Sequence, residues 1–247
     1  MRRIGLLGGT SWESTVDYYR LLNVGMRDRL GGSHSADLLL RSADFAEIEA
    51  LQVVDDWTSL GRRYAREAGA LVSAGAEVLG ICANTMHLLY DDVARSGVPV
   101  VHVVDAVADV AQAAGYTRVG LLGTRYTMAS PELYPPRMAA RGIDVVVPDP
   151  DDALEVNRII YAELVRGEVL EKSRDALEAV VARLVDRGVQ AVVLGCTELG
   201  MILVPGASPV PLLDSLAIHV EALLDAAITG PSAVPPSQPV LEESGAA

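Results

Sequence analysis

Short apolar runs alternate with longer stretches of helical periodicity along most of the chain. The runs are rich in Val, Ile and Leu and end in glycine or small polar residues, as buried parallel strands do. Between them, the stretch 57–74 places Leu60, Tyr64, Ala68 and Leu71 at near-helical spacing among arginines. We therefore expect an α/β protein with mainly parallel sheets. The predicted strands lie at 4–7, 37–42, 98–105, 118–124 and 192–194, with another that runs into a polar turn over 77–87.

The pattern restarts halfway along the chain. Residues 118–124 repeat the opening residues 3–10 with one residue missing, at an offset of 115 positions. Two further pairs recur at offsets of 114 and 109 positions, namely Cys82 with Cys196 and the expected helix caps Asp105 with Asp214. The offsets indicate an internal duplication, although short apolar strands also resemble one another by chance. We predict two pseudo-symmetric domains, each a small mainly parallel sheet flanked by helices, with the active site in the cleft between them.

Composition excludes several classes of partner and location. The formal net charge is −13 and no basic cluster stands out, which argues against nucleic acid and anionic membranes as partners. No apolar run approaches the roughly 18 residues that a membrane span needs. The opening apolar segment is too short for a signal peptide, and two cysteines far apart do not resemble a secreted disulfide framework. We expect a cytoplasmic protein, with a disordered Pro- and Ser-rich tail over 231–247.

The sequence also excludes the common cofactor and metal motifs. Lys172 is the only lysine, and it lies at the charged start of a predicted helix, where a pyridoxal Schiff base is not expected. The phosphate-binding Gly-Lys-Ser/Thr loop, the dinucleotide fingerprint and the common zinc signatures are all absent from the sequence. We therefore predict chemistry that needs no cofactor and no metal.

A thiol, a hydroxyl and a carboxylate follow one another directly after the predicted strand at 192–194. This Cys196-Thr197-Glu198 turn lies at a strand carboxyl end, where ligands bind in open α/β sheets. The alternative is a buried structural cysteine, which is a common place for that residue. Two thiols facing each other across a bound carbon could remove a proton from one side and return one to the other, which inverts a stereocentre. Donors aimed at the substrate carboxylate would have to stabilise the carbanion.

At these residues the chain resembles the aspartate/glutamate racemase family. The resemblance covers residues 5–15, 84–87, 121–128 and 195–198. It implies two pseudo-symmetric α/β domains, racemisation without pyridoxal phosphate by two acid/base residues, and homodimers. It also implies a discontinuous first domain over 1–98 and 210–230, with the second domain over 99–209.

One position departs from the family's pattern. In many members the first cysteine directly precedes Asn-Thr, but here Ala83 has that place and Cys82 lies one residue earlier. Successive strand side chains point to opposite faces, so Cys82 is expected in the core if Cys196 faces the cleft. Cys196 is then the predicted acid/base. With one thiol, racemisation would be slow or one-directional, and two alternatives stay open: a single-cysteine decarboxylase or isomerase of a small dicarboxylate, and a catalytically weak binding protein.

The expected substrate is an amino acid, aspartate- or glutamate-like or of broad specificity, or else a dicarboxylate. Its carboxylate would be met by hydroxyl and amide donors, although the same residues also form turns. Glu198 could bind an ammonium group, orient the thiol or cap a helix. Arg41 could recognise a side-chain carboxylate or form a surface ion pair. The predicted substrate-binding residues are Thr10, Ser11, Arg41, Asn84, Thr85, Thr124, Thr127, Thr197 and Glu198.

Overall fold

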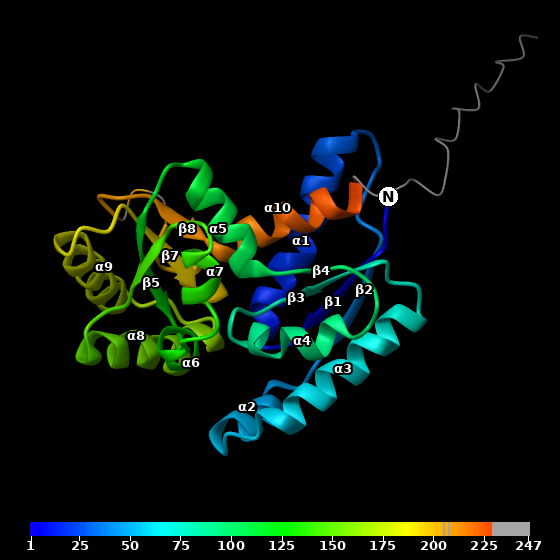
Figure 1. The fold of residues 1–247 in the computed structure, drawn as a ribbon, viewed down its shortest axis with the longest axis horizontal. Helices are drawn as coiled ribbons and strands as arrows, with labels where there is room; N and C mark the ends of the chain where they lie inside the picture. Colours follow the sequence, from blue (N-terminus) through cyan, green and yellow to red (C-terminus); the bar gives the residue numbers. More distant parts are fainter. Residues whose placement is uncertain (205, 207, 229–247) are drawn as a thin grey trace, which may run out of the picture.

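The computed structural model describes residues 1–204, 206 and 208–228, and these form two lobes, each built on a parallel four-stranded sheet (Figure 1). The first sheet has the order β2-β1-β3-β4 and the second the order β6-β5-β7-β8, so the two halves share one topology. This confirms the predicted α/β class with two similar sheets. The strands are β1 Ile4–Gly8, β2 Leu38–Ser42, β3 Val78–Ile81, β4 Val100–Val101, β5 Arg118–Gly123, β6 Asp144–Val146, β7 Ala191–Gly195 and β8 Leu212–Asp214. The tail predicted at 231–247 lies outside the described residues.

Helices cover both faces of each sheet, because every central strand is apolar on both sides. In the first lobe these are α1 Trp12–Leu30 and α10 Ser215–Ile228 on one face, and α2 Phe45–Val53, α3 Trp57–Ser73 and α4 Tyr90–Ala94 on the other. In the second lobe they are α5 Val103–Ala113 and α7 Pro135–Ala139 on one face, and α8 Pro150–Ala162 and α9 Glu171–Asp186 on the other. The remaining elements are α6 Arg125–Ala129, η1 Thr85–Leu89, η2 Leu164–Arg166 and η3 Thr197–Met201. None of the helices formed by these described residues is long and apolar enough to cross a bilayer.

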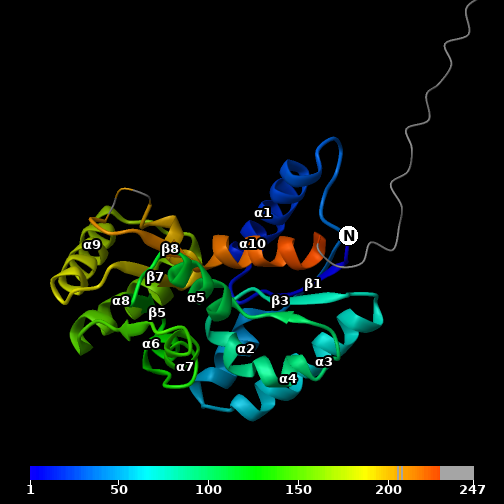
Figure 2. The same cartoon turned by 45° about the horizontal axis from the view of Figure 1, so that its top comes forward.

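The two halves exchange their last helices. Strand β4 belongs to the first sheet, but the helix after it, α5, packs on the second sheet. Strand β8 belongs to the second sheet, but α10 packs on the first, and α5 and α10 pack against each other between the lobes (Figure 2). The sheets therefore change over after Val101 and after Asp214, a few residues beyond the predicted 98/99 and 209/210 boundaries. The division into domains itself stays a prediction.

Strand register corrects the predicted pairing of the two cysteines. In the first sheet Leu7 pairs with Ile81, and in the second Leu122 pairs with Leu194. If the first strands are matched at their offset of 115, the counterpart of Cys196 is therefore Ala83, two residues after Ile81. The predicted equivalence of the cysteines is wrong by one residue. Apolar strands tolerate such a shift when only their sequences are compared, but a one-residue shift turns every side chain to the other face.

The aspartate pair is corrected in the same way. Leu79 pairs with Val100 and Val192 pairs with Leu212, which makes His102 the counterpart of Asp214. Both residues cap the helix that follows: the ring of His102 accepts from the Val104 amide at 3.1 Å, and Asp214 accepts from two amides of α10. Asp105 lies in the first turn of α5 and does not cap it.

Candidate active site

One cavity lies where the carboxyl ends of the two sheets meet between the lobes. The empty space in the cavity and in its open mouth together is about 420 Å³. Gly9 makes the sharp exit from β1 possible, because its φ is 91° and a Cβ there would lie 2.3 Å from the Ala43 backbone. The strand-end residues that line the cavity are Thr10, Ser11, Ala83, Asn84, Thr85, Thr124, Gly195, Cys196, Thr197 and Glu198.

The thiol of Cys196 is held by a buried carboxylate. Its Sγ donates to Oε2 of Glu198 over 2.9 Å, and the Thr197 hydroxyl donates to the same oxygen over 2.8 Å. The other oxygen, Oε1, accepts from the Ser11 hydroxyl at 2.5 Å, a bond that joins the first lobe to the second. Burial, and then the negative charge of Glu198, raise the pKa of Cys196 well above its ordinary value. The thiol is therefore protonated at neutral pH and has a proton acceptor in contact.

The wall contributed by the first lobe carries no thiol. Ala83 lines the cavity, whereas Cys82 is fully buried on the opposite face of the sheet, in the cluster that contains Tyr18 and Leu22. Burial raises the pKa of the Cys82 thiol. The alternation of strand side chains thus places Cys82 in the core, as expected, and leaves a methyl group where Cys196 has its sulfur.

Hydroxyl and amide groups link the two lobes beside the thiol. The Thr85 hydroxyl lies 2.9 Å from that of Thr124 and 3.0 Å from that of Thr127. Thr127 is fully buried behind the cavity wall, so this predicted binding residue supports Thr85 and Thr124 rather than facing a ligand. The Asn84 amide donates to Ser215 at 2.8 Å and accepts from the Tyr134 hydroxyl at 2.6 Å, which fixes its orientation.

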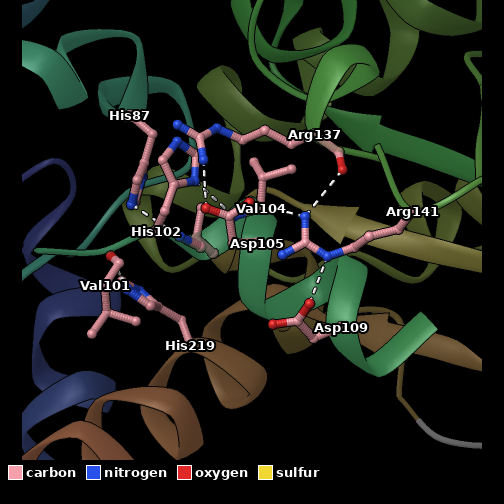
Figure 3. A network of polar contacts seen from close by, with 10 residues as sticks. His87, Val101, His102, Val104, Asp105, Asp109, Arg137, Arg141 and His219 are labelled. Atoms are coloured by element: carbon pink, nitrogen blue, oxygen red, sulfur yellow. Dashed lines mark hydrogen bonds and ion pairs between the residues drawn. The ribbon is translucent and has the colours of Figure 1, made fainter. Parts of the chain in front are cut away.

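The predicted binding residue Arg41 and the buried His87 lie away from the cavity. Arg41 pairs with Glu67 at 3.2 Å and lines a separate surface hollow beside α3. His87 packs against His102 and His219 at the junction of the lobes, with ring centres 4.6 and 5.5 Å away (Figure 3). Its Nδ1 bonds to the Ala83 carbonyl oxygen at 2.9 Å and its Nε2 accepts from the Val103 amide at 3.2 Å. Burial lowers the pKa of His87 to about 4, so the ring is neutral and structural.

The remaining wall of the cavity was not predicted from the sequence. It comes from helix surfaces, and no turn or strand-end signal marks such positions. Its residues are Phe45 and Gln52 of α2, Ile160 and Tyr161 of α8, and Val165 of η2. Within the described part of the chain, no group of three His, Cys, Asp or Glu side chains could hold a metal ion.

Comparisons with known proteins agree with this architecture. The family model described as Asp/Glu/Hydantoin racemase matches residues 7–223. The structure of a candidate Asp/Glu racemase from Yersinia pestis is 44% identical, covers 92% of this chain and 99% of its own, and superposes with a TM-score of 0.85. An aspartate racemase homologue from Pyrococcus horikoshii OT3 is 35% identical with the same coverage and a TM-score of 0.79. The aspartate racemase of Picrophilus torridus, at 21% identity, 92% and 94% coverage and a TM-score of 0.74, shares the fold.

Proposed function

Since the chain belongs to the Asp/Glu/Hydantoin racemase family, we propose that it is a cofactor-independent isomerase that exchanges the Cα proton of a small amino acid, with Cys196 as its acid/base. The observation that carries this proposal is the Sγ–Oε2 contact of 2.9 Å between Cys196 and Glu198 inside the cavity. A homodimer and a cytoplasmic location belong to the proposal as well, the first from the family resemblance alone and the second from the sequence alone.

The contact suggests how a protonated thiol can act as a base. The Cα–H bond breaks and an S–H bond forms as the original thiol proton passes to the Glu198 carboxylate. The electron pair left on Cα is delocalised into the substrate carboxylate. Hydroxyls of Thr85 and Thr124 and the backbone amides of the polar turns lie at the same cavity and can donate to that carboxylate. In reverse, the thiol returns a proton to the same face and Glu198 reprotonates the sulfur.

The methyl group of Ala83 makes this chemistry one-sided. A two-base racemase needs an acid on each face of the planar carbanion, and here the second face can be protonated only by water or by a hydroxyl group. We therefore propose that proton exchange on the Cys196 side is faster than inversion, so that racemisation is slow or runs mainly in one direction.

Exchange in heavy water tests the proposal. A panel of L- and D-amino acids is incubated with the protein, loss of the Cα proton is followed by NMR, and configuration is followed by chiral chromatography. The assignment is supported if Cys196→Ser abolishes the exchange and the matched Cys82→Ser retains it. The reverse ranking would overturn it. Carbon dioxide released from a malonate, without amino-acid exchange, would instead favour the single-cysteine decarboxylase.

A further inference from the structure

The cavity contains a negative charge and no positive one. Among the described residues that line it, none is an arginine, a lysine or a histidine, and Glu198 is the one carboxylate. Glu198 is buried and accepts three hydrogen bonds from neutral groups. A second carboxylate brought in by a substrate side chain would lose its hydration and repel Glu198, with no cation to offset either cost.

Two arginines on segments next to the cavity contact other side chains of the protein and do not line the cavity. Arg41 pairs with Glu67 beside α3. Arg125 donates to the Tyr126 hydroxyl at 2.6 Å, and its guanidinium carbon lies 4.7 Å from the centre of the Tyr126 ring. Neither lines the cavity, so neither supplies a counter-charge to a ligand there.

The helical wall offers apolar surface in place of a counter-charge. Phe45, Ile160 and Val165 line it together with the ring of Tyr161. Ile160 belongs to the main core of the second lobe, and Val165 and Tyr161 pack against that core. A substrate side chain that extends away from the strand-end donors therefore contacts apolar side chains on this wall.

Gln52 lines the same cavity and has a buried polar atom without a partner among the described residues. This residue is only 3% exposed. Its Oε1 has no hydrogen-bond partner within the described part of the chain, whereas its Nε2 donates to the Met86 sulfur at 3.4 Å. A buried carbonyl oxygen without a partner is costly, and a bound ligand that donates a hydrogen would relieve that cost. An ammonium, amide or hydroxyl group can donate to it, and an ionised carboxylate cannot.

We propose that the amino acid bound here has an uncharged side chain, apolar or amide-bearing, and that aspartate and glutamate are poor substrates. This inference rests on the proposed function and narrows it. Glu198 and Gln52, which both line the cavity, favour hydrogen-bond donors, and the other four of the five residues of the helical wall favour an apolar chain.

The sharpest test compares substrates that differ only in charge. Cα exchange in heavy water is measured for L-glutamine against L-glutamate and for L-asparagine against L-aspartate, with L-methionine as an apolar chain of similar length. We expect kcat/KM for exchange to be at least about 100-fold higher for each amide than for its acid, as in other sites that leave a buried polar group unpaired. Acids that exchange as fast as their amides overturn this inference and leave the proposed function standing. Exchange with no amino acid of the panel overturns both.

A charge placed in the apolar wall gives an independent readout. Val165 is half-buried at the wall, so a longer side chain there can reach the cavity. Val165→Lys should raise glutamate exchange relative to methionine exchange by about tenfold or more, and the matched Val165→Met has similar length without charge and should leave that ratio low. An equal ratio in both variants counts against the inference. The inference would also be overturned if the unmodified protein exchanges the Cα proton of glutamate and Arg125→Gln removes that exchange. Arg125 would then be the counter-charge.

Discussion

Replacing Ala83 by cysteine should turn a one-sided site into a two-sided one. Strand register makes Ala83 the counterpart of Cys196, and its side chain already lines the cavity, so the substitution adds one sulfur atom at the wall of a 420 Å³ space. The counterpart of Glu198 in the first lobe is Thr85, so the new thiol has no carboxylate placed as Glu198 is placed beside Cys196. It should therefore be protonated at neutral pH and act as the acid while Cys196 acts as the base.

The size of the effect follows from the role of that acid. A positioned general acid contributes about 10²–10⁴-fold to a rate. We expect Ala83→Cys to raise the inversion rate of a substrate that already exchanges by at least about 100-fold, which corresponds to about 2.7 kcal/mol of barrier. Exchange with retention should change much less, because it needs only Cys196.

The assay follows configuration and Cα–H signal in the same heavy-water reaction. Ala83→Ser is the matched control, since its side chain has similar size but a hydroxyl in place of the thiol, and it should raise inversion by less than about tenfold. The reasoning is refuted if the new thiol reacts with iodoacetamide, the protein is folded and inversion is unchanged. In that case Ala83 does not face the reacting carbon.

Three further predictions test the environment of individual side chains. Cys82→Ser should lower the free energy of unfolding by about 1–3 kcal/mol, because it buries a hydroxyl among apolar groups, while Cα exchange stays within about twofold; urea unfolding and the exchange assay check this. Glu198→Gln should lower the pKa of Cys196, because burial raises it first and the Glu198 charge second; the pH profile of Cys196 alkylation should move to lower pH, and an unmoved profile contradicts the interpretation. Burial lowers the pKa of His87 to about 4 and of His219 to about 3, so below pH 6.5 the unfolded chain binds protons that the folded chain does not. The free energy of unfolding should then fall by on the order of 1.4 kcal/mol per pH unit per histidine as the pH drops from about 6.5 toward about 4, and urea curves that do not change over this window would contradict the assignment.

The strand-based part of the site could be predicted from the sequence, because strand ends carry a local signal. Glycine and small polar residues after short apolar runs marked the turns at Thr10, Asn84, Thr124 and Cys196, and the structure brings all four to one cavity. The register between strands has no such signal. The internal repeat alone matched Cys82 with Cys196, whereas the family resemblance pointed to Ala83, and the hydrogen-bonded pairing of the strands decides for Ala83.

The helical wall could not be predicted for a different physical reason. Phe45, Ile160 and Val165 have the ordinary residue types of core-facing helix positions, and nothing in their spacing separates a cavity wall from a packed interior. Arg41 had two interpretations, a ligand contact or a surface ion pair. The structure shows the ion pair, because β2 is an edge strand and Arg41 pairs with Glu67 outside the cavity.

The symmetry of the scaffold and the asymmetry of its chemistry have one structural origin. The last helix of each half packs on the sheet of the other half. Helix α10 therefore covers the sheet of the first lobe, and α5 covers that of the second. Neither half can bury its own sheet alone, and the two lobes are held together however far their cavity residues diverge. Cross-lobe hydrogen bonds, among them those from Ser11 to Glu198 and between Thr85 and Thr124, then join the cavity wall that carries a thiol to the wall that lacks one. A duplicated fold that is joined in this way can carry a thiol on one cavity wall and a methyl group on the other without losing the cavity, which is the arrangement of Cys196 and Ala83.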